Sequence, residues 1–129
     1  MTHPIFRLFA ILFVLASAGR SFAHHSFEAT YDSSQKIQIE GVIKEILWRN
    51  PHAFVRIDVV DKEGKVTTWG LEWSALTTLA KANITKGTLK PGDRLVVTGP
   101  PGRDPSNPRM LIGSVKRPSD GWSWQGTVD

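Results

Sequence analysis

No cysteine occurs among the 129 residues of this chain. A disulfide framework, a thiolate metal site and a cysteine nucleophile are therefore excluded. The chain also lacks an apolar run of the roughly 20 residues that a stable membrane span requires, since its main apolar stretch covers only residues 8–16. A folded domain must consequently be held together by its core, to which five tryptophans and many β-branched side chains can contribute.

The first 23 residues have the pattern of a cleavable secretory leader. Arg7 precedes the apolar stretch, and the small residues Ser21 and Ala23 stand where a signal peptidase requires them. We therefore expect cleavage after Ala23, a periplasmic or secreted protein, and no membrane span after cleavage. Removing 23 of the 129 residues leaves 106, enough for one small domain, and takes away two of the 16 basic residues. The net charge then falls from +4 to +2, so we expect no nucleic-acid partner.

Apolar and β-branched residues alternate with polar ones in five segments, which is the pattern of β-strands. The second and third segments flank a polar turn at residues 61–65. Pairing Val60 with Val66 gathers nearly all of their apolar side chains on one face, so we expect a hairpin in this register. The first segment changes phase across Gly41, which predicts a strand bent at a glycine bulge. The five predicted strands are residues 37–48, 53–60, 66–73, 94–99 and 110–116.

A short helix is predicted between the third and fourth strands. Ser74 is of the type found at N-caps, and residues 75–82 carry apolar side chains at helical spacing. Three strands, one helix and two strands follow the order of the small five-stranded oligonucleotide/oligosaccharide-binding (OB) barrel, although an open sandwich or an irregular roll shares it. The expected fold class is therefore mainly β and OB-like. The predicted division is signal peptide 1–23, N-terminal segment 24–35, barrel domain 36–117 and C-terminal tail 118–129.

Three histidines remain after the predicted cleavage, namely His24, His25 and His52. An N-terminal His24 would offer both its α-amine and its imidazole to one metal ion. His52 lies in the loop between the first two strands, and the hairpin register brings Glu72 near it. Extended and doubled back along the first strand, segment 24–35 is long enough for His24 to reach His52. Such a nitrogen-rich site suits copper(II), with His25 or Glu72 assisting.

The leading hypothesis is thus a periplasmic protein that binds copper(II), a binding module rather than an enzyme, with no catalytic residue assigned. The principal alternative is a metal-free envelope adaptor that binds a protein or peptide through the barrel face and its Trp-bearing tail. An oxidative copper enzyme is a third reading, disfavoured because 106 residues offer little flat surface for a polymer substrate. Solvated histidines that bind nothing are the remaining alternative.

Two further features are interpreted as structural. Trp69 and Trp73 share the apolar face of the hairpin, which favours a place in the core over a stacking surface. Arg103 and Arg109 stand in a loop rich in proline and glycine, and because acids balance the charge elsewhere, a solvated loop is favoured over a nucleic-acid patch.

Six short motifs of the chain can be taken together: His24-His25-Ser26-Phe27, Tyr31-Asp32, Gly41-Val42, Trp48, Asn50-Pro51-His52 and Lys90-Pro91-Gly92-Asp93. In these motifs the chain resembles a family of small exported bacterial proteins of unknown function. The family is marked by His-His-Ser after the leader and Asn-Pro-His after the first strand. The resemblance covers essentially the whole mature chain and implies export and a barrel-like fold, but no activity. Its two marker segments hold all three histidines.

Overall fold

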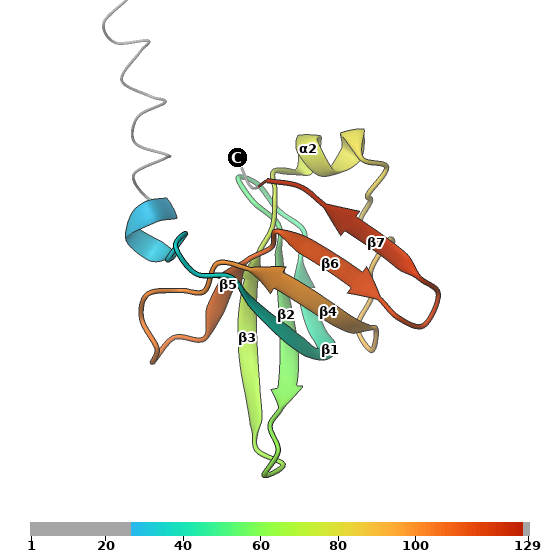
Figure 1. Cartoon of the computed structure of the whole chain (residues 1–129). Coiled ribbons are helices and arrows are strands. Elements are labelled where there is room, and N and C mark those ends of the chain that lie inside the picture. Colours follow the sequence, from blue (N-terminus) through green and yellow to red (C-terminus); the bar gives the residue numbers. More distant parts are fainter. Residues whose placement is uncertain (1–26, 128–129) are drawn as a thin grey trace, which may run out of the picture. The chain divides into compact units, whose positions relative to one another are not determined.

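A computed structural model describes residues 27–127 of the chain. The chain divides into two units, residues 1–30 and 31–129. Of the first unit only residues 27–30 are described, and they are helical. The predicted leader, His24 and His25 therefore lie outside the described residues. The described part of the second unit is mainly β (Figure 1), with the elements β1 (Ile37–Leu47), β2 (Phe54–Val60), β3 (Val66–Glu72), α2 (Leu76–Lys81), β4 (Arg94–Gly99), β5 (Arg109–Leu111), β6 (Ser114–Arg117) and β7 (Trp122–Gln125).

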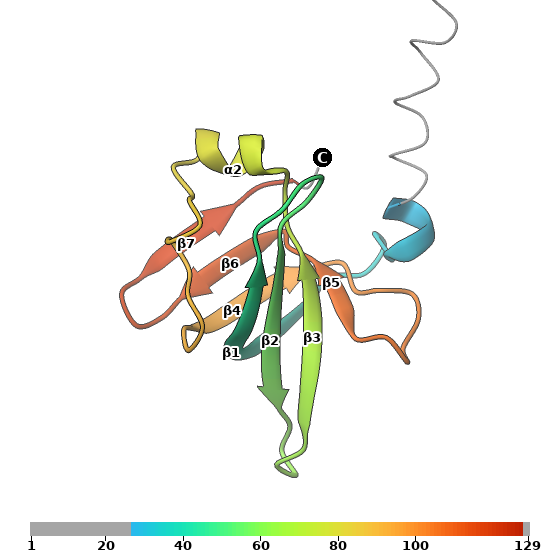
Figure 2. The ribbon, with the colours of Figure 1, turned by 180° about the vertical axis from the view of Figure 1, so that it is seen from behind.

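The strands form one sheet in the order β5-β3-β2-β1-β4-β6-β7. Every neighbouring pair is antiparallel except β3 and β5, which are parallel. Only Ile112 and Gly113 separate β5 from β6, so residues 109–117 join the edge at β3 to the edge at β4. The sheet thereby closes on itself in an OB-like arrangement. α2 covers the end opposite the β2–β3 turn, as the front and back views show (Figure 2).

The expected number of five strands is wrong, because the described chain contains seven. One additional strand arises because the predicted strand 110–116 is divided: its first part pairs with β3 and its second with β4. The other is β7, which lies in the expected C-terminal tail and pairs with β6. Its Trp124 meets the buried ring of Trp73 edge-on, with ring centroids 5.6 Å apart. Local alternation is too weak in four residues to reveal such a strand, whereas the contact with Trp73 stabilises it.

The predicted hairpin register is confirmed. Val60 pairs with Val66, Ile57 with Trp69 and Val55 with Leu71. Because successive side chains of a strand point to opposite faces, this register turns Val55, Ile57 and Leu71 into the core, where all three are fully buried. Trp73 is also buried, and Trp69 packs against the core while partly exposed, so the interpretation of both as core residues is supported.

The bend of β1 has a different cause from the one expected. The register with β2 shifts between Ile43 and Glu45, not at Gly41. Gly41 is required because the strands approach closely there: a Cβ at this position would lie 2.5 Å from the carbonyl oxygen of Asp58.

Ser74 does not cap the helix. The N-cap of α2 is Ala75, and no side chain accepts a hydrogen bond there. The Ser74 hydroxyl instead donates to the carbonyl oxygen of Thr127 at 3.2 Å. A residue type suited to capping is thus used to hold the C-terminal segment, a long-range contact that a local pattern does not encode.

The closure of the barrel yields a test. A Cβ on Gly99 would overlap the carbonyl oxygen of Leu111, whereas a Cβ on Gly70 meets only the Pro108 oxygen at 4.0 Å. We expect Gly99→Ala to lower the free energy of unfolding by about 3 kcal/mol, since the backbone has to shift. Gly70→Ala should leave it unchanged or raise it by about 0.5 kcal/mol. Urea unfolding followed by tryptophan fluorescence measures both, and equal stability of the two variants would contradict the closure.

Candidate functional site

His52 and Glu72 meet at one end of the β2–β3 hairpin. His52 lies in the loop between β1 and β2, and Glu72 is the last residue of β3. The Nδ1 atom of His52 and the Oε1 atom of Glu72 are 2.9 Å apart. Their side chains are only 16% and 12% exposed, so water weakens this contact little. The expected proximity of an acid to His52 is confirmed.

The second oxygen of Glu72 is also engaged. The Tyr31 hydroxyl donates to Oε2 at 2.5 Å, and Nη2 of Arg109 lies 3.4 Å from the same oxygen. The Arg109 Nε–H in turn donates to the Tyr31 hydroxyl oxygen at 3.1 Å, and its guanidinium lies over the Tyr31 ring, 5.1 Å from the centroid. Tyr31, His52, Glu72 and Arg109 thus form one network, the Glu72 cluster.

The position of Glu72 follows from the strand alternation. Leu71 points into the core, so Glu72 points to the outer face, where a carboxylate is ordinarily solvated. Here it is buried, because Tyr31 covers it and is itself only 1% exposed. A buried carboxylate needs donors and a nearby cation, and the cluster supplies the Tyr31 hydroxyl and the Arg109 guanidinium.

Tyr31 acts in this network as a donor. Burial raises the pKa of its hydroxyl well above the ordinary value, and the Glu72 carboxylate raises it further by accepting its hydrogen bond and by repelling a phenolate. Arg109 opposes this increase without cancelling it. The hydroxyl therefore keeps its proton and continues to hold Oε2.

Of the predicted metal ligands, the structure brings together only His52 and Glu72. His24 and His25 lie outside the described residues, and so does the α-amine of His24, which the sequence predicts as a ligand. Within residues 27–127, His52 is the single histidine, and no group of three or more His, Cys, Asp or Glu side chains is placed to hold a metal ion.

The interpretation of Arg109 as a solvated loop residue is wrong. Arg109 begins β5, and the parallel pairing places it beside Gly70 of β3. Gly70 precedes Glu72 by two residues, so both are on the same face of that strand. Tyr31 is among the residues that carry the resemblance given above, but the sequence assigns it no role. No local sequence signal reveals the place of Arg109, because that place depends on the parallel pairing of β5 with β3.

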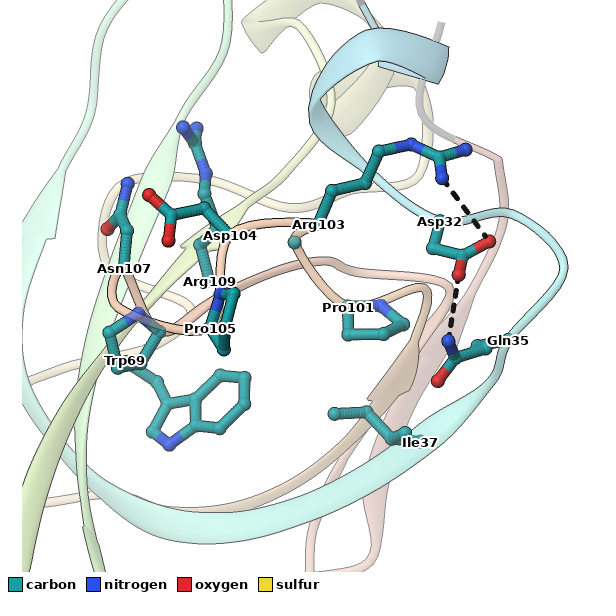
Figure 3. A pocket seen from close by; sticks show the side chains of 12 residues that line it. Asp32, Gln35, Ile37, Trp69, Pro101, Arg103, Asp104, Pro105, Asn107 and Arg109 are labelled. Atoms are coloured by element: carbon teal, nitrogen blue, oxygen red, sulfur yellow. Dashed lines mark hydrogen bonds and ion pairs between the residues drawn. The ribbon is translucent and has the colours of Figure 1, made fainter.

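A pocket of about 490 Å³ lies beside the cluster, between the loop 101–108 and the strands. Figure 3 shows Trp69 and Ile37 along one side and Arg109 and Asp104 along another. Arg103 lies 3.9 Å from Asp32, whose pKa is lowered chiefly by the hydrogen bond from Ser34. Two acids and two arginines line the pocket, so its charge is balanced and gives no preference for an ion of either sign.

These features define a small, mainly β, OB-like protein with a buried histidine–carboxylate network at the end of its hairpin. Residues 11–110 match a family of unknown function, DUF6152, and the chain belongs to that family. No curated protein matches the chain. Among the described residues no helix is long and apolar enough to cross a membrane.

Two solved structures are similar in fold. One is the mitochondrial single-stranded DNA binding protein Rim1 from S. cerevisiae, with a TM-score of 0.48 and 11% identity over 64% of this chain and 91% of that one. The other is in the Stn1-Ten1 complex of S. pombe, with a TM-score of 0.45 and 22% identity over 66% of this chain and 61% of that one.

The state of Tyr31 can be measured directly because it is the only tyrosine of the chain. We expect no phenolate absorbance near pH 10, where an ordinary tyrosine is about half ionised. Since the pKa is higher in the folded protein, the hydroxyl stabilises the fold below about pH 10 and this contribution declines as the pH rises further. In Glu72→Gln the pKa should fall yet stay above the ordinary value, because burial is the larger cause. Glu45→Gln, at an exposed carboxylate, is the control, and half ionisation of the native protein near pH 10 would refute the network.

Proposed function

We propose that this is an exported, periplasmic or secreted protein that binds copper(II) through its mature N-terminus and His52. His24 would supply its α-amine and imidazole, and His52 a further imidazole. His25 could replace the imidazole of His24 if the chain turns locally. Three nitrogen donors of this kind match the preference of copper(II) for tetragonal nitrogen sites.

The observation that carries the proposal is the hydrogen bond between His52 and Glu72. Metal-binding histidines usually donate their second ring N–H to a carboxylate, which fixes the tautomer and the orientation of the ring. With Nδ1 bonded to Glu72, the nitrogen of His52 that would take the metal is Nε2. Both oxygens of Glu72 already have hydrogen-bond partners, so in this proposal Glu72 positions the imidazole and is not itself a ligand.

The segment that joins the N-terminal ligands to the Glu72 cluster is short. Tyr31 is bound to Glu72 and follows His24 by seven residues, which span at most about 25 Å when extended. The proposal requires this short segment to bring His24 to His52.

The first test compares two N-termini. Protein that begins at His24, verified by mass spectrometry, and the same protein with one additional residue in front are titrated with copper(II) against a competing chelator. We expect the extension to weaken binding by more than the roughly 10–100-fold that loss of a supporting hydrogen bond costs, because it removes a ligand. Equal affinity of the two forms would rule out the α-amine, and binding by neither would exclude the copper function.

The second test concerns the cluster. His52→Ala should weaken copper binding as a lost ligand does, and Glu72→Gln by about 10–100-fold as a lost positioning group does. Tyr31→Phe removes the donor to Oε2 and the acceptor for the Arg109 Nε–H, and it tests the positioning role of the cluster if the Glu72 variant fails to fold. Glu45→Gln, exposed on β1 and paired with Arg56, is the matched control. Unchanged affinity in His52→Ala would remove His52 from the site.

A metal-free envelope adaptor is the second candidate, and one observation favours it. Of the described strands, β7 stands at the end of the sheet and pairs only with β6, and it carries Trp122 and Trp124. An edge strand of this kind can accept an extended peptide as an additional strand. A protein that binds no copper in the first test and retains its fold would favour this function.

A further inference from the structure

A second pocket, of about 480 Å³, lies on the outer face of β2, β3 and β5. Three arginines line it, namely Arg49, Arg56 and Arg109, and no acidic side chain does. Leu47, Phe54 and Pro108 add apolar surface. Its volume is within the range of small-molecule sites, and its charge differs from that of the balanced pocket beside Trp69.

The strand register places two of these arginines opposite each other. Arg56 on β2 pairs with Gly70 on β3, and Gly70 pairs with Arg109 on β5. Neighbouring strands lie about 4.8 Å apart, so the two arginine Cα atoms are separated by roughly 10 Å. Gly70 has no side chain, so the floor of the pocket, meaning the surface of β3 between the two guanidinium groups, is formed by backbone alone.

The present partners of the arginines leave them able to bind a ligand. Among the described residues, Arg49 has no acidic partner and its guanidinium lies over the Phe54 ring, 5.6 Å from the centroid. Arg56 pairs with Glu45 at 3.1 Å, but both side chains are about half exposed, and such surface pairs contribute little. Arg109 uses Nε and Nη2 within the Glu72 cluster, and no hydrogen bond within the described chain uses its Nη1.

We propose that this pocket binds a small organic anion, with its phosphate or carboxylate group between Arg56 and Arg109. Guanidinium groups recognise both oxyanions through paired N–H donors. Arg49 adds a third positive charge, and the apolar part of the ligand packs against Phe54 and Pro108. This inference is independent of copper binding, because neither His24 nor His52 takes part in it.

The test is a titration of the full protein with phenyl phosphate, benzoate, inorganic phosphate and the neutral benzyl alcohol. The readouts are calorimetry and the NMR shift of the Gly70 amide. We expect saturable binding of phenyl phosphate or benzoate that weakens with added salt, weaker binding of inorganic phosphate, and none of benzyl alcohol. The tighter of the two aromatic anions identifies the oxyanion.

Substitutions distinguish the contribution of the arginine charges to ligand binding from that of the shape of the pocket. Arg56→Gln and Arg49→Gln should each weaken binding about tenfold. Gly70→Val should abolish it by filling the floor, and its backbone tolerates a side chain because no positive φ and no close contact is found there. Arg94→Gln is the matched control, since Arg94 is equally exposed and pairs with Glu40 as Arg56 does with Glu45.

Two results would overturn the proposal. One is the absence of saturable binding by both aromatic anions in folded protein. The other is tighter binding of oligothymidylate than of phenyl phosphate with loss in the same arginine variants, which would assign the surface to single-stranded nucleic acid instead of a small anion.

Discussion

The burial of the Glu72 carboxylate is the constraint on which the arrangement of this end of the molecule depends. Leaving a buried charge without its partners costs about 3–5 kcal/mol, so its donors have to be held in place. They come from three distant segments: Tyr31 precedes β1, His52 follows it, and Arg109 begins β5. The Tyr31 contact continues into backbone pairing, since Tyr31 bridges to Gly102 and the Asp32 N–H donates to the Pro101 oxygen. One carboxylate thereby fixes how the chain enters the barrel.

The segment 109–117 connects this constraint to the closure of the sheet. The same three residues that pair with β3 place Arg109 next to Glu72, and the continuation of the segment pairs with β4. Arg109 therefore contributes both to the buried Glu72 cluster and to the outer pocket. Its Nε and Nη2 complete the buried network, while its side chain also lines the outer pocket. The two proposed sites have different ligands, but the Glu72 cluster and the outer pocket share this guanidinium, so the stability of the cluster determines how rigidly one wall of the pocket is held.

The parts of the fold that the sequence predicts are those encoded by local alternation. The hairpin of β2 and β3, its register and β4 follow from the spacing of apolar residues, because a slip by one residue would expose the core face. The parts that it does not predict depend on contacts between distant residues. Ser74 resembles a cap but bonds to Thr127, and β7 is held by β6 and by Trp73. Tyr31 and Arg109 are separated by 78 residues, and no local pattern relates them.

Local sequence patterns also predict the candidate site only in part. Alternation assigns Glu72 to the outer face, and an acid on an outer face is ordinarily a solvated residue without significance. The hairpin register predicts that this one lies near His52, but its burial there is revealed only by the folded structure. A histidine in a surface loop is equally unremarkable by itself. Once a buried carboxylate with a fixed orientation holds its Nδ1, however, the imidazole has one tautomer and a restricted orientation, and these are the properties that a ligand-binding histidine needs.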